Sequence, residues 1–141
     1  MSVDLSRFVD AQAPHMDNVR AELAAGRKRT HWMWFVFPQL RGLGRSEMAR
    51  HFGLQSLEEA AAWLAHPILG ERLRACVAVL LAVQGRSAHE IFGSPDDLKL
   101  RSCLTLFRAV DGADGIFAQA LEKYFDAQPD PMTLQLLADA P

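Results

Sequence analysis

The sequence of 141 residues lacks the features that mark membrane and secreted proteins. Its longest uninterrupted apolar run, residues 75–83, has nine residues, whereas a membrane-spanning helix needs about 20. The first residues, MSVDLSRFVDAQ, contain no basic segment followed by an apolar core, so no secretory signal is expected. These two absences predict a cytoplasmic protein with no membrane partner.

Cysteine is also scarce. Cys76 and Cys103 both lie in apolar surroundings, and neither has a second cysteine at ligand spacing. The histidines have no companions at metal-binding spacing either, so no metal site and no cofactor are predicted. The two cysteines are expected to be buried thiols.

No stretch alternates convincingly between apolar and polar residues, so the sequence gives little support for β-strands. Helix starts and stops are frequent instead. We therefore predict an all-α fold, a single-domain orthogonal helical bundle covering residues 1–141. The predicted helix starts are Asp4, Pro14, Ser46, Ser56, Pro67, Ser87, Ser94-Pro95 and Asp130-Pro131. The segment HWMWFVF is rich in strand formers, but Thr30 as a cap and Pro38 as a terminator favour a short helix.

The longest predicted helix, about residues 67–84, begins at Pro67 and ends before Gly85. Its second half is apolar on every face, which is typical of a buried helix. We expect this helix to lie at the centre of the bundle.

Charge is distributed unevenly along the chain. The net charge is −2, but residues 27–51 hold six lysines and arginines against Glu47 alone, which leaves +5 there and −7 elsewhere. A local basic field on an acidic protein indicates an anionic ligand or partner.

The segment RKRTHWMWFVFPQLRGLGRS, residues 27–46, combines this charge with aromatic side chains and glycines. Tryptophans offer flat faces for a ring, a glycine loop before a helix offers backbone amides, and arginines bind phosphate. The candidate ligand-binding residues are Trp32, Trp34, Gln39, Arg41, Gly42, Gly44 and Arg45, and His31 is a candidate acid or base. The alternative is that the aromatic residues are core, the glycines form a turn and the arginines are solvated.

The segment FGSPDDLKLRS gives the second set of candidates. Asp97 and Lys99 are candidate catalytic residues, and Ser102, one turn further along the same predicted helix, is a candidate ligand-binding residue. The alternative is structural, because carboxylates are favoured in a first helical turn and Asp97–Arg101 is an ordinary pair at spacing four. We expect the two segments to meet at one concave site.

Several segments resemble a small bacterial family of unknown function, the domain numbered eighteen-ten, which is sometimes mislabelled calpastatin. The specific ones are Trp-x-Trp-x-x-Phe-Pro-Gln and Phe-Gly-x-Pro-Asp-Asp-x-Lys, and the resemblance runs from about Leu5 to Leu137. It implies a mainly helical fold and no established reaction. A fainter likeness, over residues 73–99, is to the NADAR group of N-glycosidases that handle ADP-ribose.

Three functions are compatible with these patterns. The first is a pocket for a phosphorylated, ring-containing small molecule, nucleotide-like or ADP-ribose-like, which would suit a binding protein or an enzyme. The second is a nucleic-acid-binding module that uses residues 27–50 as a basic stripe. The third is a protein-interaction adaptor that uses the aromatic run as its contact. Nothing in the sequence indicates an oligomeric state.

Overall fold

The computed structural model describes residues 4–140. Within this range the chain forms ten α-helices and no β-strand, so the predicted all-α fold is confirmed. The helices are α1 (Ser6–Gln12), α2 (Met16–Ala24), α3 (Met33–Val36), α4 (Glu47–His51), α5 (Leu57–Ala65), α6 (Leu69–Ala82), α7 (Ala88–Phe92), α8 (Asp96–Asp111), α9 (Ile116–Phe125) and α10 (Pro131–Asp139).

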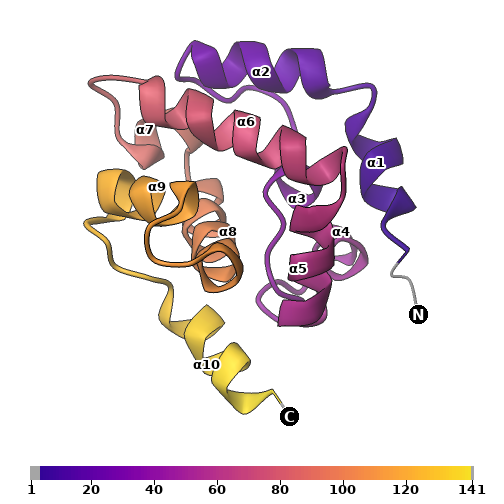
Figure 1. Ribbon diagram of the computed structural model, residues 1–141. Helices are drawn as coiled ribbons and strands as arrows, with labels where there is room; N and C mark the ends of the chain where they lie inside the picture. Colours follow the sequence, from indigo (N-terminus) through magenta and orange to yellow (C-terminus); the bar gives the residue numbers. More distant parts are fainter. Residues whose placement is uncertain (1–3, 141) are drawn as a thin grey trace.

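Neighbouring helices point in different directions (Figure 1). Helix α6 packs against α2, α5 and α9, while α8 packs against α5, α7, α9 and α10. Helix α10 projects from the lower end of the molecule, joined to α9 by residues 126–130 (Figure 1). The buried apolar side chains of these helices form one cluster.

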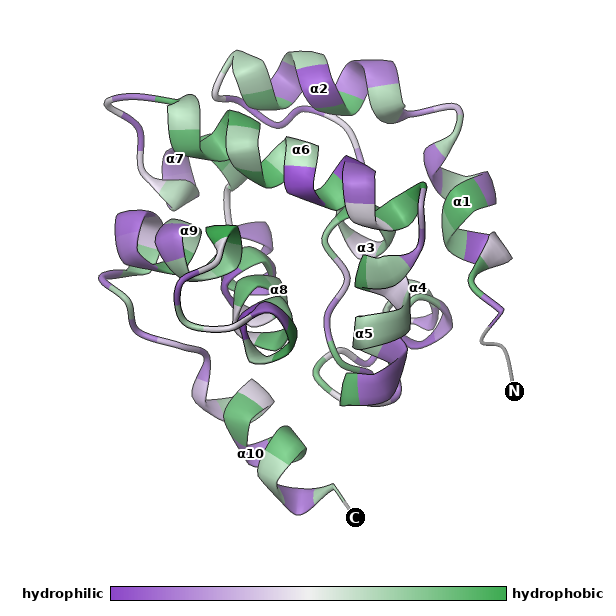
Figure 2. Ribbon diagram, in the orientation of Figure 1, coloured by the Kyte–Doolittle hydropathy of each residue, from purple (hydrophilic) through white to green (hydrophobic). Residues whose placement is uncertain are grey.

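The centre of this cluster is α8 rather than α6. Every residue from 102 to 107 is buried, which covers the whole circumference of α8 over its middle turns. The expectation of a buried central helix at residues 67–84 holds for one face only. Leu73, Val77 and Leu80 of α6 are buried, whereas Ala75 and Ala78 are exposed. Figure 2 accordingly shows hydrophilic and hydrophobic bands together on α6. The exposed face of α6 appears apolar in the sequence because it carries alanines, but their small side chains remain exposed in the structure.

Four of the predicted helix starts are confirmed by their hydrogen bonds. The side chains of Ser46, Ser56 and Ser87 each accept a hydrogen bond from the backbone N–H three residues later, and Asp130 caps α10 in the same way. The capping box at Ser87 is complete. At Ser56 the capping box is incomplete, because Glu59 accepts from the N–H of Gln55 rather than from that of Ser56.

The other five predicted starts differ from the structure. Asp4 does not cap α1, which begins at Ser6 without a side-chain cap. Helices α2 and α6 begin at Met16 and Leu69, two residues after Pro14 and Pro67.

Thr30 does not cap α3, because its hydroxyl donates to Glu22 at 2.7 Å and the helix begins at Met33. Ser94 does not cap α8 either. Pro95 occupies the capping position, and no side chain there accepts a helix N–H.

The loop from Pro38 to Ser46 is joined to the segment after α4. Leu40 and Leu54 form an isolated parallel bridge. Arg41 donates its backbone N–H to Leu54 at 2.7 Å, and Leu54 donates to the carbonyl of Gln39 at 2.9 Å. This pairing fixes the loop against the segment that follows α4. The side chains of the loop therefore lie on one side of the pairing or on the other.

Candidate functional site

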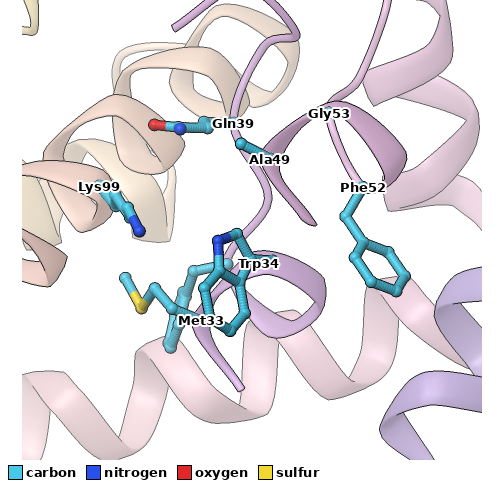
Figure 3. A pocket seen from close by; sticks show the side chains of 8 residues that line it. Met33, Trp34, Gln39, Ala49, Phe52, Gly53 and Lys99 are labelled. Carbon is cyan, nitrogen blue, oxygen red and sulfur yellow. The ribbon is translucent and has the colours of Figure 1, made fainter. Parts of the chain in front are cut away.

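The two segments singled out in the sequence meet in the structure. Trp34, in α3, is half-buried, and the Nζ atom of Lys99, in the first turns of α8, lies 5.1 Å from the centre of its ring. This is the distance of a cation–π contact. Figure 3 shows Lys99 approaching from α8, with Trp34 and Gln39 coming from the other segment.

The space at this contact has two parts. The inner part measures about 10 Å³ and is lined by Trp34 together with Met33, Phe37 and Phe52, so it holds about one water molecule. The outer part is an open groove of about 520 Å³, which falls in the range of small-molecule sites. Gln39 and Lys99 line both parts. The other residues of the groove are Leu43, Gly44, Pro95, Leu98, Arg101, Ser102, Asp130 and Met132.

The charges at the inner edge of the groove leave one ammonium facing outward. Asp96 forms ion pairs with Lys28 at 3.0 Å and with Lys99 at 3.6 Å. The side chain of Lys28 is only 7% exposed and also stacks on Trp32 at 5.0 Å. The longer of the two ion pairs belongs to Lys99, whose side chain is 25% exposed and lines the groove.

The other charged residues of the groove are engaged in structural bonds. Arg101 donates to the carbonyls of Gln128 and Pro129 at 2.8 and 2.9 Å. Asp130 accepts from the N–H and hydroxyl of Thr133. Lys99 is therefore the cation of this groove that is best placed to meet a ligand.

Comparison with known proteins assigns the chain to a family. The sequence profile of DUF1810, described as a protein of unknown function, matches residues 2–137. The chain belongs to this family. It is similar to a conserved hypothetical protein of Mycobacterium tuberculosis, whose crystal structure superposes with a TM-score of 0.95 at 55% identity, covering 97% of this chain and 98% of that one. Among curated proteins, none matches.

Trp32 is not a ligand-stacking residue of this DUF1810 chain. It is fully buried, and its indole N–H donates to Glu22 at 3.1 Å. His31 is exposed and does not line the groove that contains Lys99. The structure therefore does not bring His31 and Trp32 to the groove of Lys99, since these adjacent residues point into solvent and into the core.

Asp97 also lies outside the groove. Its carboxylate pairs with His89 of α7 at 3.2 Å and accepts the N–H of Leu98. The carboxylate next to Lys99 is that of Asp96 instead. Both aspartates were visible at the start of this helix, but the sequence did not indicate which one faces the lysine.

The predicted phosphate-binding residues are divided between two sides of the loop. Gly44 lines the groove of Lys99, and so does Ser102, although its hydroxyl donates to the carbonyl of Leu98. Arg41 lines a second groove, near α1 and α4. Gly42 and Arg45 are exposed, and Arg45 forms no ion pair within residues 4–140.

Sequence analysis missed the apolar part of the groove. Leu98 and Met132 are 57% and 58% exposed, the highest values among the exposed large hydrophobic residues of residues 4–140, and both line the groove. A leucine in the first turn of α8 and a methionine after Pro131 were assigned no role. The signal was present for Leu98, since it belongs to the charged turn that carries Lys99.

Other chemistry is limited in the described part of the chain. Burial raises the pKa of the Cys76 thiol to about 11 and raises that of Cys103 well above its usual value, and both cysteines are buried thiols, as predicted. Residues 4–140 contain no group of three or more potential metal ligands. No helix in this range is long and apolar enough to cross a membrane.

Proposed function

We propose that the groove between the 39–44 loop and the start of α8 binds a phosphorylated, ring-containing small molecule of the nucleotide or ADP-ribose type. The observation that carries the proposal is the position of Lys99. Its ammonium sits between the face of Trp34 and an open groove of about 520 Å³. Such a site offers a cation for a phosphate and apolar walls for a ring.

The apolar residues support a ring. Covering exposed leucine and methionine side chains lowers the free energy by about 25 cal/mol per Å² of apolar surface removed from water. Leu98, in α8, and Met132, in α10, line the same groove. A planar ring lying on them would cover this surface, and the carboxamide of Gln39 can donate to or accept from its polar edge.

The other two functions are less well supported. Five of the six apolar residues from Trp32 to Phe37 are at most 5% exposed, so the aromatic run is core and is not a protein contact. The predicted basic stripe is interrupted, because Lys28 is buried against Asp96. Arg41 and Arg50 line a separate groove, near α1 and α4.

Thermal melting with and without AMP, ADP or ADP-ribose tests the proposal. A ligand that binds only the folded protein raises the melting temperature by mass action. We expect Lys99→Met to weaken binding by about tenfold or more, because it removes a charged hydrogen bond while keeping the packing on Trp34. Leu98→Asp should act in the same direction by placing a carboxylate beside the phosphate.

Arg74→Met is the matched control. It removes one positive charge from an exposed residue paired with Asp111, at the opposite end of α8, about 18 Å along the helix from Lys99. The proposal fails if none of the three ligands shifts the melting of the unaltered protein, or if Lys99→Met and Arg74→Met respond alike.

A further inference from the structure

A second groove lies on the other side of the 39–44 loop. It measures about 470 Å³ and is formed by α1, the loop, α4 and the start of α5. These elements lie together at the right of Figure 1. The residues that line it are Asp4, Arg7, Arg41, Arg50, His51, Gly53, Gln55 and Glu59. Three guanidinium groups from three different elements therefore line one groove.

Arg7 is held in place by its neighbours. Its Nε donates to the carbonyl of His51 at 2.9 Å, one NH group donates to the carbonyl of Asp4 at 3.2 Å, and the other lies 3.5 Å from Glu59. A guanidinium fixed in this way cannot fold away from the groove. It retains donor capacity, since a guanidinium has five N–H groups.

Arg41 and Arg50 are different. Both are exposed, and neither forms an ion pair or a side-chain hydrogen bond with any residue from 4 to 140. Two unpaired guanidiniums in one groove repel each other, and an anion between them removes that repulsion.

The two carboxylates of the groove, Asp4 and Glu59, offset only two of its three guanidinium charges. Asp4 accepts from the N–H and the hydroxyl of Ser6, and these bonds, the backbone one first, lower its pKa. Glu59 is shared between Arg7 and the N–H of Gln55. Within residues 4–140, neither Asp4 nor Glu59 therefore forms an ion pair with Arg41 or Arg50.

The position of Arg41 depends on a close backbone approach. A Cβ atom added to Gly53 would lie 2.7 Å from the Cα of Arg41 and 2.7 Å from the carbonyl oxygen of Ala49. Only glycine lets residue 41 lie directly against the end of α4. Together with the bridge between Leu40 and Leu54, this contact keeps Arg41 on the same groove as Arg50.

From these observations we infer that this groove is a second anion site, which binds a multiply charged phosphate group such as pyrophosphate. Arginine suits this ligand because its planar guanidinium makes paired hydrogen bonds to phosphate oxygens. The site is separate from the groove of Lys99 and does not depend on the proposed function.

The test is thermal melting in inorganic pyrophosphate, compared with sodium sulfate at equal ionic strength. We expect pyrophosphate to raise the melting temperature more than sulfate does. The double variant Arg41→Gln/Arg50→Gln should lower pyrophosphate affinity by about tenfold or more. Both residues are exposed, so the variant should fold, and its melting without ligand checks this.

The matched control is Arg27→Gln/Arg29→Gln, which removes the same charge from two exposed arginines outside the groove. This control and Lys99→Met should both keep the response to pyrophosphate. Equal responses to pyrophosphate and sulfate, or a response retained by Arg41→Gln/Arg50→Gln, would overturn the inference. So would binding of a single-stranded RNA without any binding of pyrophosphate, since that would indicate an extended nucleic-acid surface.

Discussion

Glu22 organises the segment that precedes α3. Its carboxylate accepts hydrogen bonds from the N–H groups of Arg29 and Thr30, the hydroxyl of Thr30 and the indole of Trp32, at 2.7 to 3.1 Å. This one side chain of α2 therefore fixes the path of residues 29–32. Lys28, whose backbone N–H bonds to Ile91, is held at the start of the same segment and reaches Asp96.

The charge state of Glu22 should control stability in acid. Burial raises its pKa, but the hydrogen bonds from Thr30, Arg29 and Trp32 outweigh burial and lower the pKa from 4.5 to about 2. Because the folded pKa is the lower one, the stabilisation is present above pH 4.5 and is lost as the pH falls toward 2.

We expect Glu22→Gln to lower the free energy of unfolding at pH 7 by about 1–3 kcal/mol. The loss should shrink as the pH falls from 4.5 to 2, and urea titrations at several pH values measure it. Asp17→Asn, an exposed acid in the first turn of the same helix, is the control. A loss at pH 7 that persists unchanged at pH 2 would contradict this account.

Sequence reasoning was least reliable for the direction of individual side chains. Trp32 and Trp34 are two residues apart and looked equivalent, yet one is core and the other lines the site. The difference depends on Glu22 and Lys99, which are distant in sequence. The same holds for Arg41, whose side of the loop is set by the bridge to Leu54.

At the scale of helices, sequence reasoning succeeded where the determining bond is local. Ser46, Ser56, Ser87 and Asp130 each bond to an N–H three residues away, so their short patterns contain all that is needed. Thr30 has the same chemistry, but its hydroxyl bonds to a residue eight positions earlier. The bond to Glu22 takes the place of the local cap, and α3 begins at Met33 instead of directly after Thr30.

The end of α9 contains backbone strain that a substitution can relieve. Asp126 and Ala127 both have positive φ angles, of 54° and 63°, and the N–H of Ala127 bonds back to the carbonyl of Leu121 at 3.0 Å. This left-handed helix end is usually occupied by glycine, because a Cβ atom costs about 1–2 kcal/mol there.

Ala127→Gly should therefore stabilise the protein by up to about 1 kcal/mol, after subtraction of the greater freedom of glycine in the unfolded chain. The same change at Ala78, an exposed residue inside α6, should destabilise it by about 1 kcal/mol. Urea unfolding followed by circular dichroism compares the two. Effects of the same sign would show that the turn at Ala127 is not strained.

At the scale of the whole molecule, the core contains two groups of aromatic rings. The longer group joins α3, α1, α5, α8 and α9 through centroid distances of 5.4 to 5.7 Å. Its members are Phe35, Phe52, Phe8, Trp63, Phe107 and Phe117. The shorter group is Trp32, Phe37 and Phe92, and it lies behind the wall of the candidate site, because Phe37 lines the inner cavity. Packing between distant helices supports the site from behind, which no local pattern could predict.

Each group contains one fully buried tryptophan, and the two differ in one respect. The indole N–H of Trp32 donates to the ionised Glu22. Within residues 4–140, the indole N–H of Trp63 has no hydrogen-bond partner. Both side chains are 0% exposed, so replacement by phenylalanine removes the same volume and the same donor from two equally buried positions.

We expect Trp32→Phe to lower the free energy of unfolding by about 1–3 kcal/mol more than Trp63→Phe, because only the first change removes a hydrogen bond to a charged group. The second change also removes an unpaired buried donor, which offsets part of the lost packing. Urea unfolding monitored by far-ultraviolet circular dichroism is suitable, since it does not depend on tryptophan fluorescence. If Trp63→Phe costs as much as Trp32→Phe, the Trp63 N–H must have a partner, and a buried water bonded to it would be the first to seek in a crystal structure.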